Sequence, residues 1–344
     1  MNVAFFIGHP SHVHLFKNAI MELDREGHHT KVIARNKDIT LDLLNNIGID
    51  YVKSTQNSEG PLRSIRHLFG TYYYGYNNLK EFDPDVLVSR FNPAVPHLAK
   101  IYSAKCLMFE LNEKRELLAN FAAFFTDCIC TPESFTQDRG KIHQRYRGFH
   151  EMAYLHPNWF SPDPEILEKY GICAEDDYFV VRYVSWDAYH DIGHNGLTKE
   201  ERQEVINMLS KRGRVFLSTE DDINYVNAEP VPTESHEIHH LLSFADLYLG
   251  ESGTMPIEAG LLGTPSICIN PLIDDWGIFN ELVDDYELIK QIHPRDISSL
   301  DNLINNIDKK KLEVRRKEVL NDKIDLTRYI VQKIYELHNH KGTY

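Results

Sequence analysis

The segment LYLGESGTMPIEAGLLGTPSICI (residues 247–269) contains an apolar run, a turn rich in Gly and Ser, a helical pattern and a second apolar run. Leu247–Leu249 and Ser266–Ile269 are predicted strands, and Met255–Leu262 between them is a predicted helix. Two strands that are joined by a helix form a parallel pair in an α/β sheet. The apolar residues follow one another rather than alternate, which predicts strands buried on both faces.

The same alternation of strand and helix runs through the rest of the chain. The other predicted strands are Val3–Gly8, Lys31–Ala34, Asp85–Ser89, Cys106–Leu111, Asp127–Cys130, Tyr178–Val184 and Val215–Ser218. The other predicted helices are His12–Arg25, Leu41–Asn46, Lys199–Lys211 and Ser235–Phe244, followed by a charged helical stretch from Leu303 onward. The pattern therefore predicts parallel sheets with helices on both faces.

A Pro-rich segment, Asn158–Pro164, divides this pattern into two halves. We predict a first doubly wound domain over residues 1–160 and a second over 161–321. A last helix, over about residues 322–344, is expected to pack back on the first domain. Open α/β sheets bind ligands at the carboxyl ends of their strands, so we expect a site in a cleft between the domains.

The composition excludes several classes of protein. The chain has 344 residues, of which 42% are hydrophobic, and a net charge of −14. It can fill two cores, and its acidic balance argues against nucleic-acid binding, which relies on clustered Lys and Arg. The five cysteines lack zinc-finger or redox spacing, and we find no signal peptide or membrane-spanning run. We predict a cytoplasmic protein with reduced thiols and no transmembrane segment.

The turn before the predicted helix Met255–Leu262 has the features of an anion site. It begins at Glu251, and the backbone N–H groups of Ser252, Gly253 and Thr254 would lie at the helix N-terminus, where the dipole favours a diphosphate. Glu258, in the first turns, could accept two hydrogen bonds from ribose hydroxyls of the same nucleotide. A capped strand-to-helix turn explains the same residues without a ligand, and spacing alone does not decide between the two.

Three more segments carry a family resemblance: GHPSHVHLF (residues 8–16), YRGFHEMAYL (146–155) and RYVSWD (182–187). Together with the turn they span nearly the whole chain and resemble the domain-of-unknown-function 354 family. The turn also resembles the nucleotide-binding segment of GT-B glycosyltransferases and UDP-N-acetylglucosamine 2-epimerases, where the helix carries a ribose-binding glutamate. The resemblance implies a GT-B-like fold, with two Rossmann-like doubly wound domains facing across a cleft that binds a nucleotide-sugar.

The loop after the first predicted strand contains His9, His12 and His14. It resembles the GT-B loop that approaches the sugar and often supplies a base. A histidine that titrates near neutral pH suits the removal of a proton from a hydroxyl, so we predict His12 or His9 as catalytic. Zinc ligation is one alternative, although the loop supplies no further ligand. Helix capping by Ser11 beside solvated histidines is the other.

The loop that begins near Arg182 resembles the one that contacts the diphosphate in GT-B proteins. Arg182 would offer a bidentate guanidinium and Ser185 a hydroxyl. Asp187 is a catalytic candidate, and with His190, Asp191 and His194 it forms a polar cluster whose spacing fits no specific metal site. Solvated loop residues are the alternative reading of this cluster, and no metal is predicted.

Two carboxylates, Glu110 and Glu113, follow the predicted strand Cys106–Leu111. The epimerase resemblance implies catalytic carboxylates near this region, although the stretch from Glu110 to Glu113 departs from that motif. A glutamate with a raised pKa would serve as a general acid or base, and we include Glu110 among the catalytic candidates. A surface helix cap is the alternative.

Residues 236–240, HEIHH, match the zinc-protease pattern H-E-x-x-H. The predicted helix that contains them runs directly into a buried strand, which is typical of a doubly wound fold, so we do not expect a protease. The first strand is not followed by G-x-G-x-x-G, which argues against a nicotinamide cofactor, and the chain has no Walker motif.

These features predict a metal-independent glycosyltransferase. It would move a sugar from a UDP-linked donor to a hydroxyl acceptor, either a glycan or a lipid-linked molecule, in cell-envelope or polysaccharide biosynthesis. The nucleotide-sugar is a co-substrate, no other cofactor is expected, and peripheral contact with a membrane is compatible with this role. The alternatives are an enzyme like UDP-N-acetylglucosamine 2-epimerase and a non-catalytic nucleotide-sugar-binding protein.

Overall fold

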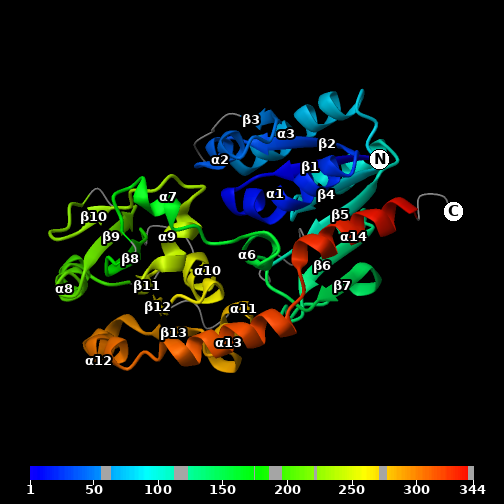
Figure 1. The fold of residues 1–344 in the computed structure, drawn as a ribbon. Helices are drawn as coiled ribbons and strands as arrows, with labels where there is room; N and C mark the ends of the chain where they lie inside the picture. Colours follow the sequence, from blue (N-terminus) through cyan, green and yellow to red (C-terminus); the bar gives the residue numbers. More distant parts are fainter. Residues whose placement is uncertain are drawn as a thin grey trace. The chain divides into compact units, whose positions relative to one another are not determined.

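The structure is a computed structural model that describes residues 1–55, 63–111, 123–173, 175–185, 196–220, 223–270 and 277–339. The chain divides into two compact units (Figure 1). The N-terminal unit consists of Met1–Trp159 and Lys323–Tyr344, and the C-terminal unit of Phe160–Asp322. The last helix thus belongs to the unit that the first residues build.

The described strands of the N-terminal unit form one parallel sheet in the order β3-β2-β1-β4-β5-β6-β7. Their bounds are Asn2–Ile7 (β1), His29–Arg35 (β2), Tyr51–Thr55 (β3), Val86–Arg90 (β4), Lys105–Phe109 (β5), Cys128–Pro132 (β6) and His143–Tyr146 (β7). The order reverses direction beside β1, which pairs with β2 on one side and β4 on the other. This reversal makes the β1–β4 edge the topological switch point of the sheet.

Helices cover both faces of this sheet. They are Pro10–Arg25 (α1), Thr40–Asn46 (α2), Arg63–Leu79 (α3), Ala94–Ile101 (α4), Met152–Leu155 (α6), Leu326–Asn339 (α14) and the short turn Gly140–Ile142 (η1). On β1, Phe6 packs with residues of α3 and α4, while the ring of Phe5 lies 5.7 Å from that of Phe16 in α1. The hydroxyl of Thr327 in α14 donates to the carbonyl of Ala153 in α6 at 2.6 Å, which fastens the last helix to the unit.

The described strands of the C-terminal unit form a second parallel sheet in the order β10-β9-β8-β11-β12-β13. Their bounds are Tyr178–Tyr183 (β8), Arg214–Thr219 (β9), Glu229–Pro230 (β10), Leu247–Gly250 (β11), Ser266–Ile269 (β12) and Ile289–Ile292 (β13). Here the order reverses between β8 and β11, so the switch point lies where these two strands end.

The helical segments of this unit are Glu165–Glu168 (α7), Lys199–Leu209 (α8), Ile238–Phe244 (α9), Thr254–Leu262 (α10), Gly277–Asn280 (α11), Glu281–Asp285 (η4), Pro294–Ser299 (η5), Leu300–Asn305 (α12) and Lys309–Asp322 (α13). Helix α8 begins with a capping box formed by Thr198 and Glu201. Helix α10 is buried from Pro256 onward and ends at Gly263, whose φ of 91° is the left-handed conformation that favours glycine.

Both sheets are parallel and flanked by helices, which confirms the predicted α/β class. Within the described residues, no helix is long and apolar enough to cross a membrane.

Candidate functional site

Apart from Glu110, which follows β5, the predicted site residues that the structure describes lie at or near the two switch points. Ser185 follows β8, and the turn from Glu251 to Thr254 follows the neighbouring strand β11. His9 and His12 follow β1 in the other sheet. Since loops diverge at a switch point and leave a crevice there, these are the places where an open α/β sheet binds ligands. Asp187, Glu113, His190, Asp191 and His194 lie outside the described residues.

The turn between β11 and α10 requires a glycine at its start. A side chain at Gly250 would come within 2.7 Å of the carbonyl oxygen of Arg182, so only glycine lets the turn lie this close to β8. Asn270 donates to the carbonyl of Glu251 at 2.7 Å, and the hydroxyls of Ser252 and Tyr248 lie 3.1 Å apart. Contacts with β8, Asn270 and Tyr248 therefore fix the turn, and the N-terminus of α10 lies at the switch point.

Glu251 fastens this turn to the loop after β8. Its side chain is fully buried, and its carboxylate accepts N–H groups of Val184 and Leu197 at 3.2 and 2.9 Å. Arg202 of α8 donates to both carboxylate oxygens, at 2.6 and 3.3 Å. Burial raises the pKa of Glu251, and the Arg202 guanidinium opposes that rise. Its carboxylate thus faces protein groups, and the assignment of Glu251 to ligand binding remains a prediction.

Glu258 lies in the second turn of α10, and its carboxylate is buried. Oε1 of Glu258 lies 3.2 Å from Nε2 of His239, which comes from α9 and is also buried. A ring N–H that donates to one oxygen fixes the direction of the carboxylate. The arrangement orients Glu258 as expected of a group that accepts hydrogen bonds, and the prediction that it binds a ribose remains a prediction.

Arg182 and Ser185 meet at one carboxylate. The guanidinium of Arg182 donates to Oγ of Ser218 at 2.5 Å and forms an ion pair with Glu220. The N–H and the hydroxyl of Ser185 lie 3.2 and 3.4 Å from Oε2 of the same glutamate. The two residues predicted to hold a diphosphate therefore converge, and what they hold in this structure is the oxyanion of Glu220.

In the N-terminal unit, Nδ1 of His12 accepts a hydrogen bond from the N–H of Gly8 at 3.2 Å. Nδ1 of His9 likewise accepts the N–H of Ser11 at 3.2 Å, which caps α1. A neutral imidazole whose Nδ1 accepts carries its proton on Nε2. In this tautomer both rings donate hydrogen bonds from Nε2. To accept a proton at Nε2, either ring would first have to carry its proton on Nδ1 instead.

Positive charge surrounds the two imidazoles. Burial, with Lys37 next, lowers the pKa of His9 to about 4. Burial, with Arg90 next, holds the pKa of His12 well below its ordinary 6.5. Both rings are therefore neutral at pH 7. The carboxylate of Asp38, 4.0 Å from Nε2 of His9, opposes this and raises the pKa of His9.

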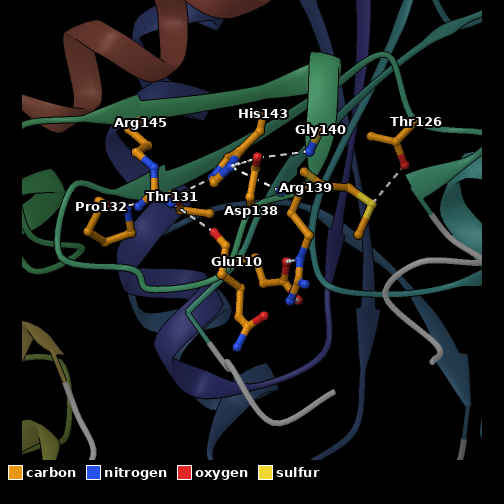
Figure 2. Close-up of polar contacts among 11 residues, drawn as sticks. Glu110, Thr126, Thr131, Pro132, Asp138, Arg139, Gly140, His143 and Arg145 are labelled. Atoms are coloured by element: carbon orange, nitrogen blue, oxygen red, sulfur yellow. Dashed lines mark hydrogen bonds and ion pairs between the residues drawn. The ribbon is translucent and has the colours of Figure 1, made fainter. Parts of the chain in front are cut away.

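Glu110, the catalytic candidate after β5, lies in a buried ion pair. Nε and Nη2 of Arg139 donate to its two carboxylate oxygens at 2.8 and 3.2 Å, and both side chains are almost fully buried. Figure 2 shows this pair beside His143, which links Thr131 at 2.8 Å to Asp138 at 3.3 Å. A carboxylate held by both oxygens is arranged for support of the loop rather than for proton transfer.

A family model described as "Protein of unknown function (DUF354)" matches residues 1–339. The chain belongs to this family. Across 85% of its length, this DUF354 chain is 25% identical to the uncharacterized protein MJ0665 of Methanocaldococcus jannaschii, covering 87% of that protein.

Solved structures of similar fold include two kinds of enzyme. The UDP-GlcNAc 2-epimerase of Neisseria meningitidis, bound to UDP-GlcNAc, has a TM-score of 0.66 at 15% identity, over 98% of this chain and all of that one (100%). The calicheamicin glycosyltransferase CalG4 has a TM-score of 0.62 at 14% identity, over 99% of each chain. These likenesses confirm the GT-B-like fold of two Rossmann-like units, and at these identities they show the fold alone.

The H-E-x-x-H pattern of this DUF354 protein does not form one helical face. Helix α9 begins at Ile238, three residues later than the predicted helix, so His236 and Glu237 precede it. Lys169 and Tyr170 donate to the carboxylate of Glu237. Over the described part of the chain, no group of three or more His, Cys, Asp or Glu side chains is placed to hold a metal ion.

Proposed function

We propose that this DUF354 protein transfers a sugar from a UDP-linked donor to a hydroxyl acceptor. The observation that carries the proposal is a convergence at one switch point. Arg182, near the end of β8, and Ser185, just after it, meet there with the N-terminus of α10, which follows β11. These groups supply a guanidinium, a hydroxyl and backbone N–H donors, which together suit a diphosphate. Arg182 and Ser185 already bind an oxyanion, the carboxylate of Glu220, which supports this use.

In the proposed reaction, the N–H groups of Ser252, Gly253 and Thr254 hold the diphosphate with Arg182, and Glu258 accepts the ribose hydroxyls. The acceptor oxygen forms a bond to the anomeric carbon as the bond from that carbon to the diphosphate breaks. The helix dipole and the cation stabilise the departing UDP. Binding both substrates in fixed positions lowers the entropic part of the barrier. The acceptor would be a glycan or a lipid-linked molecule in envelope or polysaccharide assembly, and no metal is required.

The tautomers of His9 and His12 refine their proposed roles. With Nδ1 of each ring accepting a backbone N–H, each can hold an acceptor oxygen by donating from Nε2. The acceptor's proton reaches Nε2 of either ring only after the ring changes tautomer. We therefore propose that both histidines bind the acceptor. Either one acts as the base only in the tautomer whose Nε2 carries no proton.

A second candidate is epimerisation of the sugar, which the likeness to the Neisseria epimerase favours. Epimerisation would need acid and base groups on the sugar, and the buried pair of Glu110 with Arg139 offers no carboxylate prepared for that exchange. Transfer therefore ranks first. Release of a 2-epimerised sugar from the nucleotide-sugar without any acceptor would reverse this ranking, and binding without turnover would indicate a non-catalytic protein.

Binding of UDP tests the proposal directly. Thermal unfolding with UDP, GDP, CDP and dTDP should show stabilisation by UDP, about 2.7 kcal/mol at a hundred times its dissociation constant. Glu258→Gln should weaken UDP about tenfold or more, because hydrogen bonds to a charged group contribute about 1.5–3 kcal/mol each. Glu287→Gln, at an exposed carboxylate of the same unit, is the control. No stabilisation by any nucleotide would remove the proposal.

A further inference from the structure

The segment YRGFHEMAYL (residues 146–155) is the one stretch of the family resemblance to which the proposed reaction gives no role. It begins at the last residue of β7, at the carboxyl edge of the N-terminal sheet. Asn18 of α1 donates to the carbonyl of Ala153 at 2.8 Å. The ring of His14, also in α1, lies 5.1 Å from that of Tyr154. The segment therefore packs against the helix that follows β1.

His150, in the middle of this segment, lies at the same end of the sheet as His12. Its ring is 6.4 Å from that of Phe109, the last residue of β5. The ring of Phe109 is in turn 5.9 Å from that of Phe16. Phe16 comes four residues after His12 and so lies on the same face of α1. Burial is the main cause of the low pKa of His12, and the nearby ring of His150 is one of the further causes.

The two rings differ in the hydrogen bonds at their nitrogens. The N–H of Gly8 donates to Nδ1 of His12, which places the proton of that ring on Nε2. His150 is 5% exposed, and over the described part of the chain its Nε2 has no hydrogen-bond partner. Buried polar atoms of this kind are usually paired, and a ligand is a partner that the chain itself does not supply. Nε2 of His150 can accept a hydrogen bond when the ring carries its proton on Nδ1.

Two neutral imidazoles of this kind match a hydroxyl group. Burial, with Arg90 next, holds the pKa of His150 well below its ordinary 6.5, so this ring is neutral at pH 7, as is that of His12. A hydroxyl both donates and accepts, so it can receive Nε2–H of His12 while it donates to Nε2 of His150. A carboxylate has no hydrogen for His150 at this pH, and an ammonium has no lone pair for His12. The pair therefore selects a neutral hydroxyl.

We propose that His150 is the base of the sugar transfer, and that its Nε2 accepts the proton of an acceptor hydroxyl held by Nε2–H of His12. The inference rests on the proposed sugar transfer and names its base. As the acceptor oxygen bonds to the anomeric carbon, its O–H bond breaks and the proton passes to Nε2 of His150. The electron pair of the bond between the anomeric carbon and the diphosphate oxygen leaves with UDP. The imidazolium then releases its proton to solvent.

This assignment keeps the hydrogen bond from Gly8 to His12 intact. A base at Nε2 of His12 would need its proton on Nδ1, where it would face the N–H of Gly8 donor to donor. Among the described residues, Nε2 of His150 makes no bond that would have to break. Its low pKa makes His150 a weak base. A hydroxyl becomes strongly acidic once its oxygen bonds to the anomeric carbon, so a weak base is sufficient for a late proton transfer.

Nitrogen NMR spectra of the histidine rings test the two tautomers without any substrate. The signals of His150 are those that disappear in His150→Gln, and His12→Gln identifies those of His12. At pH 7 we expect the proton of His12 on Nε2 and the proton of His150 on Nδ1. A proton on Nε2 of His150 would overturn the inference, because both rings would then be donors.

Release of UDP tests the base itself, with UDP-N-acetylglucosamine, UDP-glucose and UDP-galactose as donors and water as the acceptor hydroxyl. His150→Leu and His150→Gln should each slow the release about a hundredfold or more, since neither side chain takes up a proton. UDP affinity and the thermal unfolding of both variants should stay close to those of the wild type. His29→Leu, at an exposed histidine of the same unit, should change neither the rate nor the affinity.

The outcomes separate this inference from the proposal on which it rests. The amide of a glutamine accepts a hydrogen bond, so a wild-type rate in His150→Gln would show a positioning role and overturn the base. An unchanged rate in His150→Leu would overturn it as well. Failure of the wild type to bind UDP would remove the sugar transfer and the base together. Binding of UDP without release from any of these sugars would remove the base and favour a protein that binds the donor without turnover.

Discussion

The two switch points have the same topology and different electrostatics. In the C-terminal unit two carboxylates pair with cations, Glu251 with Arg202 and Glu220 with Arg182, and a third, that of Glu258, lies 3.2 Å from the ring of His239. In the N-terminal unit the nearby charges are cations: after burial, Lys37 lowers the pKa of His9 most and Arg90 that of His12. One backbone design thus presents one edge whose carboxylates are held by neighbouring side chains and one edge whose two imidazoles lie near cations. The fold positions each edge, and the side chains at the strand ends decide what each can bind.

The largest effect should come from the buried pair of the C-terminal edge. Arg202→Leu leaves the carboxylate of Glu251 buried without its cation, so we expect a loss of about 3–5 kcal/mol in the free energy of unfolding. Urea unfolding followed by circular dichroism measures it. Lys309→Gln, which breaks an exposed pair with Asp246, should cost less than about 1 kcal/mol. Equal losses of unfolding free energy in the two variants would mean that burial does not make the Glu251–Arg202 pair more important for stability than the exposed pair.

An intermediate effect should come from Glu220. Its carboxylate occupies the donors that a diphosphate would use, so Glu220→Gln should strengthen UDP binding about threefold, in keeping with an exposed ion pair. Calorimetric titration with UDP measures the change, and Glu229→Gln, at the exposed pair with Arg214, is the control. Weaker binding in Glu220→Gln would show instead that Glu220 orients Arg182 for the ligand.

The smallest effect should be the pH dependence that His9 contributes. The unfolded chain takes up this proton as the pH falls below 6.5, whereas the pKa of about 4 delays its uptake in the folded protein. Stability from His9 is therefore present above pH 6.5 and lost between 6.5 and 4. The side chain is 43% exposed, so we expect less than about 1 kcal/mol.

Urea unfolding of the wild type and His9→Gln at pH 7 and pH 4.5 measures this contribution. The wild type should lose more stability than the variant over that interval. An identical loss in both proteins would show that His9 titrates alike in the folded and unfolded chains.

The sequence predicted the interior of both sheets and missed their edges. All strands that the pattern indicated lie inside the sheets, where consecutive apolar residues are buried on both faces. The described strands that it missed are β3, β7, β10 and β13, and each is the last strand at one side of its sheet. In β7, for example, Gln144 and Arg145 are exposed. An edge strand pairs on one side only and carries polar residues, so it lacks the signal of a buried strand.

The sequence predicted which backbone segments form the site, but not the partners of the charged side chains in it. Glycines, turns and helix starts are local signals, and they located the segments at Gly8 and Gly250. The partners of the charged groups are not local: Arg202 is 49 residues from Glu251, and Glu220 is 35 residues from Ser185. Arg202 and Glu220 follow no motif, and the packing of helix on sheet alone brings them to their partners. Histidine tautomers likewise depend on which backbone N–H lies opposite the ring.

Helix α14 completes the first unit from the far end of the chain. Its Thr327 bonds to the same Ala153 carbonyl that accepts Asn18 of α1 at 2.8 Å. On the ribosome, all residues of Phe160–Asp322 are therefore made before the helix that closes Met1–Trp159. Domains fold as units during synthesis. The N-terminal unit is begun first, but its last residues are made only after the C-terminal unit is complete. A message that ends after Asp322 would leave the C-terminal unit whole and the N-terminal unit without one covering helix.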